Sequence, residues 1–194
     1  MERRRVAFHE AGHLVMALIL RLDVLGCDIS RRRAKYTGEL GRCTVFDPDP
    51  VGVRKFLLAM GGIMAETHFF SDDMGGIKDR VDAYAQLRRF LSHYNHMPGY
   101  DTLKPVLEEA SDLFYTEPVL NILEEAASLL TRKVRIGPEQ ISHLRDKLER
   151  TVENEKLVIM LNTLEDPPDP LNWKEIGHEL LKKGEFLLKK IRKM

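Results

Sequence analysis

The order of hydrophobic and polar positions predicts a short sheet region near the N-terminus, with one helix before it and helices after it. Residues 6–22 contain no proline and are apolar on most positions, so we predict a helix that is buried on most of its faces. Residues 25–30 and 41–46 are short apolar runs that predict strands, and Gly38 between them indicates a turn. Two or three strands are too few for an independent sheet, so we expect them to pack against helices.

The remainder of the chain has a helical period of close to 3.6 residues. The predicted helices cover residues 53–70, 77–93, 103–114, 119–134, 138–154 and 173–193. This order predicts an α+β fold that is mainly α-helical, with a small sheet beside the first helix. We expect one domain over residues 1–135 and a helical extension over residues 136–194 that packs on the same body.

The balance of charges argues against several classes of partner. Among 194 residues, lysine plus arginine and aspartate plus glutamate each number 30, so the net charge predicts neither a nucleic-acid nor a membrane partner. The short arginine cluster at residues 3–5 is expected to be solvated. The apolar run 14–20 is too short to cross a bilayer. The only two cysteines, Cys27 and Cys43, are expected to be reduced thiols of a cytoplasmic protein.

The sequence His-Glu-Ala-Gly-His at residues 9–13 is the strongest indication of chemistry. Residues four apart in a helix are separated by one turn and by about 40° around the axis, so His9 and His13 can reach one ion. Glu10 lies about 100° from His9, which suits a general base for a water rather than a third ligand. The alternative is a pair of buried histidines that only contact backbone carbonyls. Burying two imidazoles and a carboxylate in an apolar helix is costly, which favours a metal.

A catalytic zinc also needs a third protein ligand and one open position. The spacing of the downstream residues does not choose among several candidates, because the ligand comes from another element. The candidates are Glu66, His68, Asp72, Asp73, Asp79 and Asp82.

Four stretches resemble motifs of the FtsH family of membrane-anchored, ATP-dependent zinc proteases, and they occur in the family's order. They are residues 6–13 (Val-Ala-Phe-His-Glu-Ala-Gly-His), 38–42 (Gly-Glu-Leu-Gly-Arg), 61–66 (Gly-Gly-Ile-Met-Ala-Glu) and 75–80 (Gly-Gly-Ile-Lys-Asp-Arg). The resemblance covers roughly residues 3–95 and implies the family's peptidase fold. It departs from the family at Arg42, Ile63 and Lys78, where the family has tyrosine, arginine and asparagine.

The resemblance implies a role for particular residues. His9 and His13 would bind Zn²⁺ together with Asp79, which corresponds to the family's third ligand, and Glu10 would be the catalytic base. The motif at the substrate cleft of the family corresponds to residues that would contact the polypeptide substrate. These are Gly38, Leu40 and Gly41.

The predicted function is therefore that of a zinc metalloendopeptidase that hydrolyses flexible polypeptides. The chain has no phosphate-loop motif, so we expect no ATPase activity of its own, and a homo-oligomer or a separate ATPase is a possible partner. The alternatives are a non-catalytic interaction module that keeps the peptidase fold, and zinc hydrolysis of a non-peptide amide. Candidates for stabilising the oxyanion are His68, Tyr84, His93, Tyr94 and His96.

Overall fold

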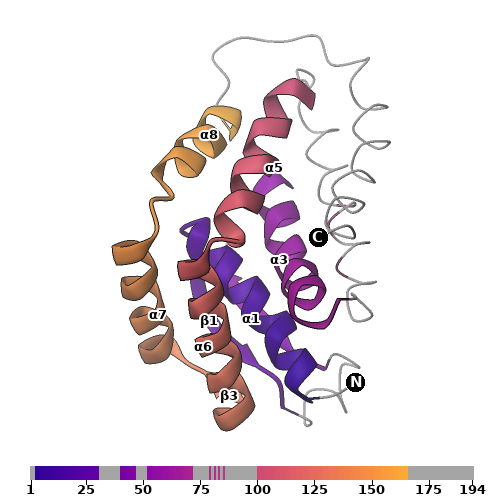
Figure 1. Ribbon diagram of the computed structural model, residues 1–194, viewed down its shortest axis with the longest axis vertical. Coiled ribbons are helices and arrows are strands. Elements are labelled where there is room, and N and C mark those ends of the chain that lie inside the picture. Colours follow the sequence, from indigo (N-terminus) through magenta and orange to yellow (C-terminus); the bar gives the residue numbers. More distant parts are fainter. Residues whose placement is uncertain are drawn as a thin grey trace.

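The computed structural model describes residues 3–30, 40–46, 52–71, 79, 81, 83, 85 and 100–165. Within these residues the fold is mainly helical with one three-stranded antiparallel sheet, which confirms the predicted α+β class (Figure 1). The elements are α1 (Arg3–Ile19), β1 (Asp23–Asp28), β2 (Arg42–Phe46), α3 (Gly52–Phe70), α5 (Tyr100–Phe114), α6 (Glu117–Lys133), β3 (Arg135–Ile136), α7 (Pro138–Thr151) and α8 (Glu155–Glu165).

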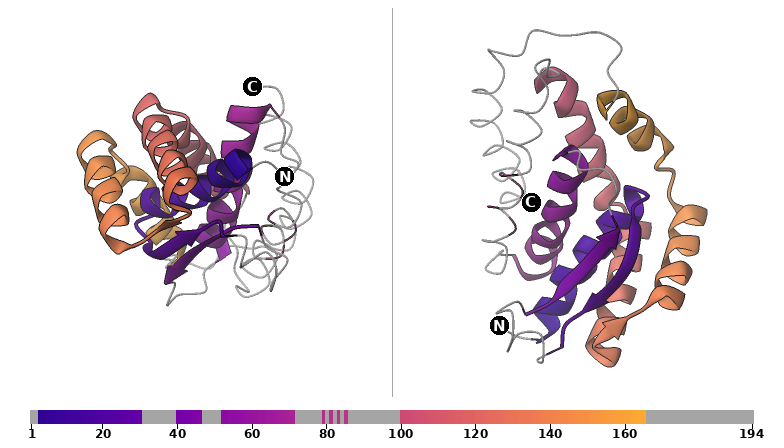
Figure 2. Two further views of the ribbon diagram at one scale, coloured as in Figure 1. Left: turned by 90° about the horizontal axis from the view of Figure 1, so that it is seen from below. Right: turned by 180° about the vertical axis from the view of Figure 1, so that it is seen from behind.

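Helix α1 is the centre of the molecule. It packs against α3 and α6, while β1 and β2 cross another of its sides (Figure 2). Nearly every residue from Val6 to Ile19 is buried, which explains why this segment is apolar on most positions instead of alternating with a helical period. Helix α1 is therefore packed between α3, α6 and the strands, and within the motif at residues 9–13 only His13 is partly exposed.

Helices α1 and α3 touch through their backbones at a pair of glycines. A Cβ atom added to Gly12 would lie 2.3 Å from the carbonyl oxygen of Gly61, and one added to Gly61 would lie 2.5 Å from the carbonyl oxygen of Gly12. No other residue fits at either position without moving the helices apart. This contact sets the distance between the helix that carries the histidines and α3.

The sheet has the order β2-β1-β3, and both pairings are antiparallel. Among the described residues, no strand pairs with the outer edge of β2. The short strand β3 was not predicted, because two residues are too few to show an alternating pattern. Strand β3 begins at Arg135, so the domain boundary expected after residue 135 falls inside a strand that pairs with β1. The division into two domains stays a prediction.

The C-terminal helices differ from expectation in one place. The helix predicted over residues 138–154 corresponds to α7, which ends at Thr151, whereas α8 over Glu155–Glu165 was not predicted. The side chain of Asn154 accounts for the break between these two helices, because it donates a hydrogen bond to the carbonyl oxygen of Ile19 at 2.6 Å and so closes the end of α1. The predicted helix 173–193 lies outside the described residues, as does most of 77–93.

Substituting Gly12 with alanine is expected to destabilise the fold by about 1–3 kcal/mol, because the added methyl group forces α1 and α3 apart. The better helix propensity of alanine, about 1 kcal/mol, offsets only part of this cost. Urea unfolding measures the difference. Gly26→Ala is the control, since its Cβ would meet nothing nearer than 3.4 Å. A Gly12→Ala protein as stable as wild type would contradict the close contact.

None of the described helices is both long enough and apolar enough to span a bilayer.

Candidate metal centre

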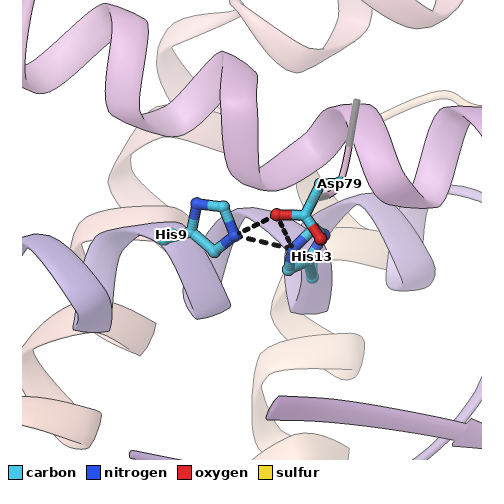
Figure 3. Close-up of side chains that lie close together, drawn as sticks. All are labelled: His9, His13 and Asp79. Carbon is cyan, nitrogen blue, oxygen red and sulfur yellow. Dashed lines mark hydrogen bonds and ion pairs between the residues drawn. The ribbon is translucent and has the colours of Figure 1, made fainter. Parts of the chain in front are cut away.

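His9, His13 and Asp79 bring three potential ligand atoms together beside α1 (Figure 3). The Nε2 atoms of the two histidines are 3.0 Å apart. Asp79 Oδ2 lies 2.7 Å from His9 Nε2 and 3.7 Å from His13 Nε2. The three side chains are buried or half-buried, and within the described part of the chain they form the one group of this kind. Two imidazole nitrogens and one carboxylate oxygen therefore meet at a single point.

The second nitrogen of each ring faces an oxygen on α3. His13 Nδ1 lies 2.8 Å from the carbonyl oxygen of Leu58, which can only accept a hydrogen bond, so Nδ1 carries the proton. His9 Nδ1 lies 2.8 Å from Glu66 Oε1. When Nδ1 of a neutral imidazole donates in this way, the lone pair is on Nε2 and points to the metal. The Leu58 carbonyl therefore holds the His13 ring in the orientation that a metal site needs, and Glu66 places a carboxylate beside the outer nitrogen of His9.

Glu66 is in turn held by a positive charge. Its side chain is fully buried, and Arg5 Nε donates to Glu66 Oε2 at 2.9 Å. Arg5 was expected to be solvated with its arginine neighbours, and that prediction is wrong, because only 16% of its side chain is exposed. Arg5 precedes His9 by one helical turn. This spacing in the sequence could have indicated that Arg5 lies on the same side of the helix as the histidine.

Because Gly62 has no side chain, it leaves room for the imidazole rings of His9 and His13. A Cβ atom at this position would lie 2.6 Å from His13 Nε2 and 2.8 Å from His9 Cε1. Any side chain on α3 here would therefore collide with the potential ligand atoms. The two adjacent glycines of α3 have different roles, since Gly61 contacts the backbone of α1 and Gly62 faces the rings.

The electrostatics of the cluster favour a cation. Burial lowers the pKa of His9, but hydrogen bonds to Asp79 and Glu66 and the charge of Glu10 outweigh it and raise that pKa to about 10. Burial would raise the pKa of Asp79, yet the rings of His13 and His9 hold it well below its usual range. Without a metal, the carboxylates around His9 favour its protonated, positively charged form. A divalent cation would balance the same carboxylates in place of the proton.

Glu10 lies on the side of α1 that faces the sheet region, and only 6% of the residue is exposed. Its carboxylate packs against Gly41, where an added Cβ would lie 2.6 Å from Glu10 Oε1. The backbone N–H of Cys43 donates a hydrogen bond to it. Burial raises the pKa of Glu10, and the nearby rings of His13 and His9 act in the opposite direction. The carboxylate is therefore fixed by β2 within the electrostatic influence of the histidines.

The other predicted residues have different outcomes. Leu40 is 46% exposed and Gly41 contacts Glu10, whereas Gly38 lies outside the described residues. Glu66 contacts the outer nitrogen of His9 instead of joining the cluster. Exposed His68 meets the ring of Phe69 edge to face and lies against the tilted ring of Tyr115. The remaining candidates lie outside the residues whose side chains are described: Asp72, Asp73, Asp82, Tyr84, His93, Tyr94 and His96.

Glu66→Gln is expected to weaken zinc binding by about 10–100-fold, because it removes the charge that orients His9 while keeping the volume of the side chain. Competition against a chromogenic chelator measures the affinity. The control is Glu124→Gln, which makes the same change on the exposed face of α6. Equal zinc affinity of Glu66→Gln and wild type would show that the Glu66 contact has no part in metal binding.

Neither a comparison with models of protein families nor a comparison with curated proteins finds a match to this chain.

Proposed function

We propose that this protein is a zinc-dependent peptidase that hydrolyses peptide bonds in flexible polypeptides, with Glu10 as the general base. The observation that carries the proposal is the convergence of His9 Nε2, His13 Nε2 and Asp79 Oδ2 while both Nδ1 atoms are engaged by α3. The two Nε2 atoms are hydrogen-bonded to each other at 3.0 Å, and His9 Nε2 also contacts Asp79 Oδ2 at 2.7 Å. The atoms that partner one another are thus the three that one ion could bind together.

Zinc is the metal that the donor set fits best. Catalytic zinc sites use three protein ligands, and two histidines with one carboxylate are a common set. The half-buried position of Asp79 gives the cluster one side toward solvent, which suits an open fourth position. When bound, zinc would polarise a carbonyl group and make a water molecule more acidic.

Glu10 would take the proton from the attacking water and later deliver it to the amine of the leaving group. Its raised pKa suits this task, because a base must hold the proton during part of the reaction. Gly41 and the Cys43 N–H restrict the carboxylate to one position beside the histidines. A purely structural metal site would need the histidines but would not need this carboxylate.

The outer edge of β2 would bind the substrate. A peptide that adds to this edge gains backbone hydrogen bonds, and it passes next to Gly41 and therefore next to Glu10. Only an extended segment can pair with an edge strand, so the substrate would be a flexible or unfolded stretch of polypeptide. Leu40 and Phe46, with 46% and 56% of their surfaces exposed, offer apolar contacts at the two ends of the strand.

The resemblance to the FtsH peptidase fold supports the proposal through particular contacts. The segment that resembles the family's Gly-Gly motif supplies Gly61 against α1, Gly62 against the rings and Glu66 against His9. The segment that resembles the family's third-ligand motif supplies Asp79. The resemblance and the geometry thus favour the same ligands.

The experiment that tests the function is cleavage of a casein-like flexible substrate by the purified protein loaded with zinc. We expect cleavage that stops with a chelator and returns when zinc is restored. A protein that binds one zinc ion and still leaves a broad set of flexible substrates intact would reject the proposal. The fold would then be a non-catalytic interaction module.

A further inference from the structure

Cys27 and Cys43 lie directly opposite each other on β1 and β2. Residues paired in this way point to the same face of a sheet, so both thiols lie on one side of it. Cys27 is 1% exposed, and its Sγ contacts the carbonyl oxygen of Glu10 at 3.6 Å, so this side faces α1. Cys43 is partly exposed and packs at the margin of the same core.

The distance between the strands suits a disulfide bond. Cβ atoms of directly opposed residues are about 4.5–5.5 Å apart. A disulfide requires about 3.5–4.5 Å, so an approach on the order of 1 Å is enough. No rearrangement of the fold is needed to join the two thiols.

Both cysteines also touch Glu10. The backbone N–H of Cys43 binds the carboxylate of Glu10, and the thiol of Cys27 contacts its carbonyl oxygen. A movement of β2 toward β1 at Cys43 would therefore displace the group that fixes the carboxylate. A displacement of about 1 Å of a catalytic group can lower a rate by about a hundred-fold.

We propose that Cys27 and Cys43 form a redox modification site, in which a hydroperoxide closes a disulfide between β1 and β2 and thereby moves Glu10 out of its position. The partly exposed Cys43 thiolate attacks the peroxide, the O–O bond breaks, and Cys43 becomes a sulfenic acid. The Cys27 sulfur then attacks the Cys43 sulfur, and the S–O bond breaks as the S–S bond forms. The departing hydroxide takes the Cys27 proton and leaves as water. The two thiols lose two electrons, and hydrogen peroxide is reduced to two waters.

The modification itself does not depend on the proposed peptidase function, and it is tested first. The zinc-loaded protein is treated with hydrogen peroxide and studied by intact mass and peptide mapping. We expect the loss of two hydrogen atoms, a Cys27–Cys43 peptide pair and full reversal by dithiothreitol. Cys27→Ser should stop at a Cys43 sulfenic acid that dimedone traps. Two thiols that persist in peroxide, an intermolecular dimer, or direct conversion to sulfinic acid would each overturn the proposal.

The effect on hydrolysis does rest on the proposed function. The disulfide form is expected to lose at least about ten-fold in activity at unchanged zinc content and to regain it on reduction. The double variant Cys27→Ser with Cys43→Ser should keep its own starting activity in peroxide. Glu10→Gln should still form the disulfide, which separates the thiol chemistry from catalysis. A disulfide form as active as the reduced protein would overturn the regulatory role. A protein that forms the disulfide but never cleaves peptides would reject the peptidase function alone.

Discussion

Replacing Glu10 with glutamine is expected to lower the rate of peptide hydrolysis by about 10²–10⁴-fold while one zinc ion stays bound. Glutamine keeps the shape of the side chain, so it fits against Gly41, and its carbonyl oxygen can still accept from the Cys43 N–H. It cannot take a proton from water. The loss should therefore appear in kcat, and the zinc content measured by atomic emission should equal that of wild type.

Two comparisons make the Glu10 result specific. Glu124→Gln removes a carboxylate from an exposed position of α6 and should leave kcat unchanged. Circular dichroism of Glu10→Gln should match wild type, because the substitution preserves volume at a buried position. A Glu10→Gln protein with the wild-type kcat would remove Glu10 from the reaction.

Replacing Asp79 with alanine is expected to lower zinc affinity on the order of a hundred-fold to a thousand-fold. The binding free energy of zinc in protein sites is about 10–16 kcal/mol, and three or four ligands contribute to it. Asp79 Oδ2 is the only carboxylate oxygen among the three clustered atoms. Stoichiometric zinc should therefore be lost on dialysis against a mild chelator, and hydrolysis should be lost with it.

Asp82→Ala and Glu66→Ala are the matched variants for Asp79, because the sequence left all three carboxylates as candidate ligands. Asp82→Ala should keep stoichiometric zinc. Glu66→Ala should bind more weakly than wild type but more tightly than Asp79→Ala, since Glu66 contacts the ring of His9 at its outer nitrogen. Retention of zinc by Asp79→Ala, with loss in either of the others, would reassign the third ligand.

The sequence predicted the elements that carry strong local signals. The helix that carries His9 and His13 was expected from an unbroken apolar run, and the structure buries it between α3, α6 and the sheet. The pair of histidine ligands could be predicted because both residues belong to one helix. In a helix, the number of residues between two positions determines whether their side chains point in the same direction.

Contacts between distant segments could not be predicted in the same way. The pairing of Arg5 with Glu66 depends on how α1 crosses α3, and no local pattern records that crossing. For the same reason, the spacing of residues in the sequence did not identify the third candidate ligand. Only the motif resemblance pointed to Asp79. The pairing of Cys27 with Cys43 depends on the register of β1 and β2. The hydrophobic pattern of two short strands does not determine that register.

The position of Asp79 has a consequence for the folding equilibrium as well as for chemistry. Strands β1 and β2 and helix α3 all lie between His13 and Asp79 in the sequence. An ion held by both residues would close these elements into a loop and act as a non-covalent cross-link, which reduces the entropy of the unfolded chain. Because only the folded chain brings the three side chains together, zinc would raise the melting temperature in proportion to the logarithm of its concentration above the dissociation constant. Metal supply would then set the fraction of the protein that is folded in addition to its reactivity.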